Sequence, residues 1–206
     1  MSALRRFCLL ALPLTLISPL SAQQGDRKGH NMTSFVPEDV IPPAPFLKVQ
    51  DALKSFQLAP GFIIEEVVSE PLVDMPCTLK FDADGQMWIC ELVGYMPDVD
   101  GKGENIAQGR IVVLADSDND GKVDQRTIFL EKLLLPRSLY LLDDGILWAN
   151  QESLFFQGRD GNKPVGERVV IDKDYARGGN VEHKANSLVL GLDNWIYSAK
   201  SDRRYK

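Results

Sequence analysis

His183 and Glu182 are the side chains of this sequence best suited to acid–base chemistry. Only two histidines occur, and the other, His30, lies in a proline-rich segment. Imidazole titrates near neutral pH, so it can accept the proton of a substrate hydroxyl, while a neighbouring carboxylate orients the ring or holds the substrate. His183 stands just before an apolar run that we expect to be a strand, and loops at strand ends commonly build sites. The alternative is a surface histidine without a chemical role.

A second candidate site is the acidic stretch Asp116–Asp124. Carboxylates stand at its first, third, fifth and ninth places, and glycine stands at the sixth. Such spacing lets a loop curl around Ca²⁺, because glycine permits the sharp turn and oxygen ligands fill the coordination shell. The predicted ligand set is Asp116, Asp118, Asp120, Lys122 and Asp124. The twelfth place holds Thr127 rather than the glutamate of an EF-hand, so we expect a β-hairpin loop, and the alternative is a solvated acidic hairpin tip.

One short helix and many short strands must position these residues. Lys48–Phe56 has helical spacing of apolar residues, and Pro60-Gly61 follows it. From Phe62 onward, short runs rich in Val, Ile, Leu and aromatic residues recur between Asp, Asn and Gly, which predicts an all-β fold. The expected strands are Ile63–Val68, Thr78–Phe81, Met87–Cys90, Ile111–Leu114, Thr127–Leu130, Ser138–Leu142, Ile146–Asn150, Leu154–Gln157, Arg168–Ile171, Ser187–Leu190 and Trp195–Ala199.

A repeated hairpin favours one all-β architecture. An apolar strand, an acidic or Asn/Gly turn and a strand carrying an aromatic residue occur at 79–88, 139–148 and 188–197. Their spacing of about fifty to sixty residues is the scale of one propeller blade. We therefore expect residues 47–206 to form about the first three blades of a β-propeller, with the tryptophans in the blade cores rather than as sugar platforms. A propeller ring needs about four to eight blades, so the sequence looks truncated.

Glu182-His183 is followed at 186–197 by the stretch N-S-L-V-L-G-L-D-N-W-I-Y. This segment resembles the soluble quinoprotein glucose/sorbosone dehydrogenases, in which a histidine precedes the pattern G-R-L-x-x-G-x-D-x-x-I-Y. The resemblance implies that His183 is the general base, which takes the sugar hydroxyl proton while hydride passes to pyrroloquinoline quinone (PQQ), and that Glu182 lies in the sugar site. The sequence departs from the family at Asn186-Ser187, which stands in place of Gly-Arg. It departs again at 200–202, where Asp202 alone is retained as a cofactor-binding residue.

Further stretches cover most of the remaining chain: 56–62, 70–73, 81–88, 91–97, 116–124 and 195–201. They resemble exported bacterial propeller proteins classed as membrane-bound dehydrogenases, which often carry a c-type haem domain after the propeller. The resemblance implies oxidation of an alcohol or sugar hydroxyl, with electrons passed to a downstream haem domain or another electron-transfer partner. The haem-attachment pattern Cys-x-x-Cys-His does not occur in the 206 residues, so we expect any such domain beyond Lys206. The alternative is a non-catalytic propeller that binds carbohydrate or protein through the same loops.

The amino end predicts export. Arg5-Arg6, the apolar run Phe7–Leu20 and the small residues Ser21-Ala22 form the pattern of a secretory signal peptide over residues 1–22. The apolar run is too short and too often interrupted by proline for a membrane span, and the alternative is an uncleaved amino-terminal anchor. Residues 23–46 are polar and rich in proline, which is typical of a linker or a strap. The net charge of −6 argues against nucleic acid as a partner, because phosphate binding needs a basic face.

Cys77 and Cys90 would be the cysteines left after removal of the signal peptide, and they flank the expected turn at 81–85. In an exported protein two such cysteines can pair. A two-residue loop at Ala83-Asp84 would place them opposite one another, whereas a bulge at Gly85 would shift the register by one residue and prevent the bond. Both outcomes, a disulfide and two thiols, are compatible with the sequence.

Overall fold

The protein is described by a computed structural model that covers residues 40, 45–98, 101–178, 181–199 and 203–206. The chain divides into two units, Met1–Pro42 and Pro43–Lys206, and exposed Val40 is the described part of the first unit. The predicted signal peptide and most of the predicted linker therefore lie outside the described residues. Among the described residues, no helix combines the length and the apolar character that crossing a membrane requires.

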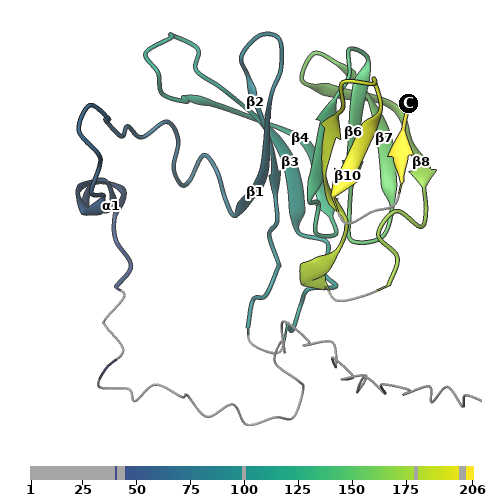
Figure 1. The fold of residues 1–206 in the computed structure, drawn as a ribbon, viewed down its shortest axis with the longest axis horizontal. Coiled ribbons are helices and arrows are strands. Elements are labelled where there is room, and N and C mark those ends of the chain that lie inside the picture. The colour runs from purple at the N-terminus through teal and green to yellow at the C-terminus, as the bar shows by residue number, and fades with distance from the viewer. Residues whose placement is uncertain (1–39, 41–44, 99–100, 179–180, 200–202) are drawn as a thin grey trace, which may run out of the picture. The chain divides into compact units, whose positions relative to one another are not determined.

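The second unit is mainly β, as predicted, with one α-helix before the strands (Figure 1). The helix, α1, spans Val49–Ser55. The strands form three antiparallel sheets, with β1-β2-β3-β4 in the first, β5-β6-β7-β8 in the second and β9-β10-β11 in the third. Their bounds are β1 Pro76–Phe81, β2 Met87–Glu91, β3 Gly109–Ala115, β4 Gln125–Leu133, β5 Ser138–Leu141, β6 Gly145–Ala149, β7 Leu154–Asp160, β8 Lys163–Asp172, β9 Asn186–Leu190, β10 Ile196–Ala199 and β11 Arg204–Tyr205.

The first and third hairpins share one turn geometry. Phe81 pairs with Met87 and Leu190 pairs with Ile196, so five residues lie between the paired positions in each hairpin. The fourth of these five, Gly85 in one turn and Asn194 in the other, has a positive φ of 78° and 61° respectively. Glycine and asparagine are the residues that adopt this conformation most readily, which explains why they recur at this place.

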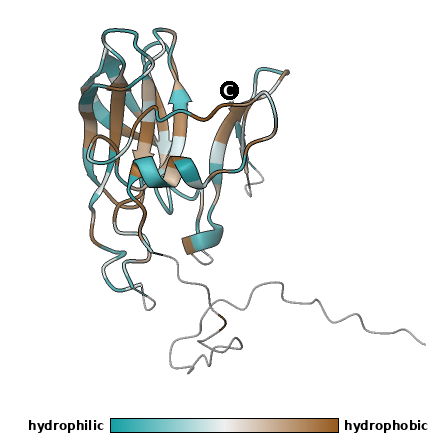
Figure 2. Cartoon of the chain, turned by 90° about the vertical axis from the view of Figure 1, so that its left-hand side faces the viewer, coloured by the Kyte–Doolittle hydropathy of each residue, from teal (hydrophilic) through white to brown (hydrophobic). Residues whose placement is uncertain are grey.

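Two cores join the three sheets in chain order. Trp88 and Trp148, fully buried, share a cluster with residues of β3, β4 and β5 between the first and second sheets. A second cluster joins β6 and β7 to Leu188 and Ile196 of the third sheet. Figure 2 shows hydrophobic residues gathered along the strands and hydrophilic residues in most of the connecting loops. The expectation that the tryptophans are core residues is confirmed for these two, whereas Trp195 is only partly buried in the turn before β10 and belongs to neither cluster.

The observed strands differ from the predicted ones at both ends of the series. The expected strand Ile63–Val68 does not form; the Val67 carbonyl accepts one hydrogen bond, from the Val123 amide. A β-branched run forms a strand only where a neighbouring strand pairs with it, and this run has no such neighbour among the described residues. Ile63 is accordingly left 80% exposed. At the other end, Arg204–Tyr205 forms β11 against β10, where no strand was expected. The Tyr205 hydroxyl donates to Asp172 Oδ2 at the end of β8, which holds this last segment in place.

Cys77 and Cys90 are free thiols. The β1–β2 register places Thr78, not Cys77, opposite Cys90, and this is the one-residue shift expected from a bulge at Gly85. Cys90 is buried and Cys77 is exposed, and loss of water around each sulfur raises the pKa of both thiols, so both stay protonated at neutral pH.

Candidate ligand pocket at the strand starts

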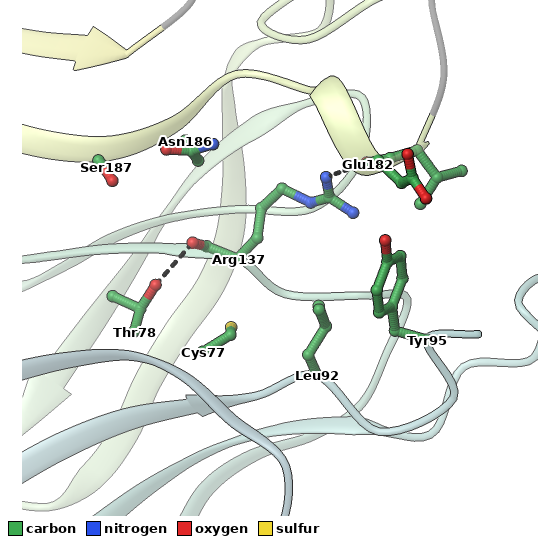
Figure 3. Close-up of a pocket in the computed structure, with 9 residues that line it drawn as sticks. Cys77, Thr78, Leu92, Tyr95, Arg137, Glu182, Asn186 and Ser187 are labelled. Carbon is green, nitrogen blue, oxygen red and sulfur yellow. Dashed lines mark hydrogen bonds between the residues drawn. The ribbon is translucent and has the colours of Figure 1, made fainter. Parts of the chain in front are cut away.

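A pocket lies where the first strands of the three sheets begin. Strand β5 contacts both β1 and β9, and residues at or just before the starts of these three strands line one pocket. The pocket has a volume of about 300 Å³. It is lined by Cys77, Thr78, Leu92, Tyr95, Arg137, Val181, Glu182, Asn186 and Ser187, most of them labelled in Figure 3. The site is therefore assembled from segments that are far apart in the sequence.

Backbone hydrogen bonds hold Arg137 at the first position before β5. Its amide donates to the Ala149 carbonyl, 2.9 Å away on β6. Its carbonyl accepts a 2.7 Å hydrogen bond from the Thr78 hydroxyl of β1. Arg137 is thus tied to two sheets at once, so the position of its side chain depends on the packing of one sheet against the other.

The Arg137 side chain is the main buried charge of the pocket. Arg137 is 9% exposed, and its Nη1 donates a 2.6 Å hydrogen bond to the Val181 carbonyl. Its Nε and Nη2 are buried and have no hydrogen-bond partner among the described residues. Burial lowers the pKa of the guanidinium, although arginine stays charged at any physiological pH. Figure 3 shows the Arg137 side chain pointing toward the side of the pocket from which Glu182 and Tyr95 come.

Glu182 and His183 belong to a short 3₁₀ turn, Val181–His183, just before β9. Glu182 lines the pocket, whereas His183 is not among its lining residues. The His183 Nε2 lies 3.7 Å from the Glu182 Oε2, and about a third of each side chain is exposed. On the facing loop, burial and then the carboxylates of Glu182 and Glu104 raise the pKa of Tyr95, so its hydroxyl remains a donor at neutral pH.

A buried ion-pair network supports the base of the pocket. Glu91, at the end of β2, is 0% exposed, and it accepts hydrogen bonds from Arg110, Arg126 and the Asp74 amide. The next residue, Leu92, lines the pocket and donates its amide to the Met75 carbonyl at 2.9 Å. The network therefore fixes both the segment that leads into β1 and the loop that leaves β2.

A family model described as a domain of unknown function, DUF7133, matches residues 48–206. The chain belongs to the DUF7133 family. The matched range includes every strand, the pocket and the acidic stretch. No curated protein and no solved structure matches the chain.

The acidic stretch of this DUF7133 domain forms the loop between β3 and β4. Carboxylate oxygens of Asp116, Asp118 and Asp120 lie within 4.8 Å of one another, as a shared cation would require. Asp124 instead accepts hydrogen bonds from the Ser117 amide and hydroxyl, which lower its pKa. The Lys122 amide donates to Asp120 Oδ1 at 2.8 Å. Three of the five predicted ligands are thus gathered, and Asp124 closes the loop.

The cofactor-binding candidate Asp202 lies outside the described residues. Two residues that line the pocket, Arg137 and Tyr95, were not predicted from the sequence. A signal for Arg137 was present in the repeat. Each of the three hairpins, 79–88, 139–148 and 188–197, begins with a leucine. The two residues before that leucine are Cys77-Thr78, Arg137-Ser138 and Asn186-Ser187. Five of these six line the pocket. In the DUF7133 domain, equivalent positions in a structural repeat therefore mark the site, whereas local motifs alone did not.

Proposed function

We propose that this domain is the amino-terminal part of an exported, dehydrogenase-like β-propeller that oxidises an alcohol or sugar hydroxyl. The observation that carries the proposal is the pocket of polar side chains at the starts of β1, β5 and β9. In a propeller the first strand of each blade lies next to the central axis, and loops at one face of the ring build the site. The contacts of β5 with β1 and β9, and the two cores between consecutive sheets, support the assignment of the sheets as blades.

In this proposal Glu182 binds a substrate hydroxyl and His183 accepts its proton. Both side chains are part of the turn before β9, and both are partly open to solvent. A rotation of the imidazole about its side-chain bonds is needed to reach a hydroxyl in the pocket, because His183 is outside the lining. Catalytic hydrogen bonds often form only when substrate is bound, so this geometry is compatible with a general base.

The proposed electron acceptor is PQQ, a planar tricarboxylate that takes up hydride. The described pocket offers one buried cation, Arg137, with one unpaired edge, and Glu182 adds a carboxylate to the same lining. These residues do not match three carboxylates, so the proposal assigns no quinone contact to them. Asp202, the candidate from the resemblance, is itself an anion and adds no partner for a carboxylate. Electrons would then pass to a haem domain or another electron-transfer partner.

Dye reduction tests the catalytic assignment. We expect the full-length protein, supplied with PQQ and Ca²⁺, to reduce a dye in the presence of an alcohol or sugar. The His183→Ala variant should lower kcat by about 10²–10⁴-fold, because a positioned general base contributes on that scale.

The control for this experiment is His30→Ala, which removes the other histidine of the chain and should leave turnover unchanged. Equal turnover of His183→Ala and the parent protein would remove His183 as the base. If no substrate gives turnover, the pocket belongs to a non-catalytic propeller that binds carbohydrate or protein. The place of His183 outside the pocket lining is the observation that favours this second function.

We also propose that Asp116, Asp118 and Asp120 bind Ca²⁺, on the basis of their gathered oxygens. Ca²⁺ at about a hundred times its dissociation constant should raise the free energy of unfolding by about 2.7 kcal/mol. Asp118→Ala should abolish this increase, measured by urea denaturation with and without Ca²⁺. Asp84→Ala, in an exposed turn of another hairpin, is the matched control and should retain it. A parent protein that is equally stable in Ca²⁺ and in chelator would exclude the site.

A further inference from the structure

The unpaired edge of Arg137 has a defined geometry. The guanidinium is planar and rigid, and its Nε–H and one N–H of Nη2 point in the same direction from one edge. Nη1 is occupied by the Val181 carbonyl, and the atoms without a partner among the described residues are the Nε and Nη2 of that single edge. Two parallel donors therefore lie together on one edge of a side chain that lines the pocket, and a ligand reaches them once the lining side chains shift, because both atoms are closed to solvent.

Buried donors of this kind require a partner. Almost all buried polar groups in proteins are hydrogen-bonded, and an exception calls for a water, an ion or a ligand. Arg137 is 9% exposed. The hydrogen bonds of its backbone amide and carbonyl hold its main chain in place. Two parallel N–H groups match the two oxygens of a carboxylate, which accepts such a pair in bidentate fashion.

The rest of the pocket favours hydroxyl groups over further negative charge. Glu182, which lines the same pocket as Arg137, repels a second anionic group but accepts hydrogen bonds from hydroxyls. Asn186 and Ser187, at the start of β9, supply neutral polar groups on the opposite part of the lining. The volume of about 300 Å³ is at the small end of ligand pockets, which fits a molecule the size of one sugar unit.

We propose that the pocket binds an acidic monosaccharide, an aldonate or a uronate, with its single carboxylate on the Nε–Nη2 edge of Arg137. Its hydroxyls contact Glu182 and the residues at the start of β9. A phosphorylated sugar fits less well, because a dianion has more oxygens than this edge has donors and lies against Glu182. The inference rests on the proposed function in taking this pocket as the substrate site, and it names the substrate class.

Calorimetric titration of the full-length protein tests the inference without quinone or electron acceptor. We expect gluconate or glucuronate to bind at least about tenfold more tightly than glucose, because an unfilled edge leaves buried donors unpaired. Arg137→Lys keeps the charge but loses the bidentate edge, so it should weaken gluconate binding at least about tenfold and leave glucose binding little changed. Arg177→Gln, at an arginine whose side chain is 80% exposed, is the control and should bind gluconate like the parent.

The comparison of ligands in the parent protein needs no variant, so a folding defect in Arg137→Lys would not remove the test. Equal affinity for gluconate and glucose, tighter binding of glucose 6-phosphate than of gluconate, or gluconate binding unaffected by a folded Arg137→Lys would each overturn the inference. Gluconate binding that depends on Arg137 without any dye reduction would keep the inference and remove the dehydrogenase. Dye reduction with neutral sugars, without tighter binding of acidic ones, would keep the dehydrogenase and remove the inference.

Discussion

Replacing Glu91 by alanine is expected to lower the free energy of unfolding by about 3–5 kcal/mol, the cost of breaking a buried ion pair by removing one partner. Glu91 is 0% exposed and accepts from Arg126 Nη1 at 2.6 Å and from Arg110 Nε at 2.7 Å. The two arginine side chains are 18% and 27% exposed, so without Glu91 their charges stay largely desolvated. Urea denaturation at pH 7 measures the effect.

The same pair gives the stability a pH dependence. Burial by itself raises the pKa of Glu91, but the hydrogen bonds from Arg126 and Arg110 outweigh burial and hold the pKa below its ordinary value. A carboxyl with a depressed pKa stabilises the fold fully above its unfolded pKa, about 4.3, and loses that contribution as pH falls through the lower folded pKa. The difference between parent and Glu91→Ala should therefore be constant near neutral pH and shrink in acid.

Glu131→Ala is the control for this prediction. Its side chain is 59% exposed and pairs with the neighbouring Lys132 on the surface, so the change should stay within about 0.5 kcal/mol. A Glu91→Ala protein that is as stable as Glu131→Ala would mean that solvent reaches Arg110 and Arg126. The pocket would be affected as well, since Leu92 and the Met75 carbonyl that it bonds are held next to this network.

The sequence predicts the hairpins because their signals are local, but it does not predict how each turn is built. The acidic turns before Gly85 and Gly145 look alike, yet the glycines have different roles. Gly85 has a φ of 78°, whereas Gly145 begins β6, where a Cβ would lie 2.5 Å from the Gln157 carbonyl oxygen. One glycine is needed for its backbone angle and the other for space beside β7, and that second requirement arises only from the packed sheet.

The pocket shows a similar limit of sequence reasoning. Glu182 was predicted from a local motif and lines the pocket, but Arg137 has no motif of its own. Its importance comes from burial, from the Val181 carbonyl on one side of the guanidinium and from the empty edge on the other. Each of these depends on three sheets meeting at their first strands, which is a long-range property. The repeat alignment could have indicated the position, though not the unpaired edge.

The repeat also leads to a second large stability effect. Trp88→Ala is expected to lower the free energy of unfolding by about 3–5 kcal/mol, as for other fully buried aromatic residues. Trp88 is 0% exposed in the core between the first two sheets, and its ring packs edge-on against Phe129 with centroids 4.9 Å apart. Its Nε1 also donates to Asp82 Oδ2 at 2.9 Å, which ties the core to the first hairpin turn.

Trp195→Ala is the control, because Trp195 lies in the turn before β10 and does not hold the place of Trp88 in the repeat, which is taken by Tyr197. Trp195 is only partly buried, and the guanidinium of Arg204 lies over its ring at 4.4 Å. Losing that contact should cost about 0.5–1 kcal/mol. Chemical denaturation of both variants measures the two losses. Equal losses would mean that Trp195 is buried as Trp88 is, for example by a further sheet packed on the third one, whereas a large difference supports the burial described here.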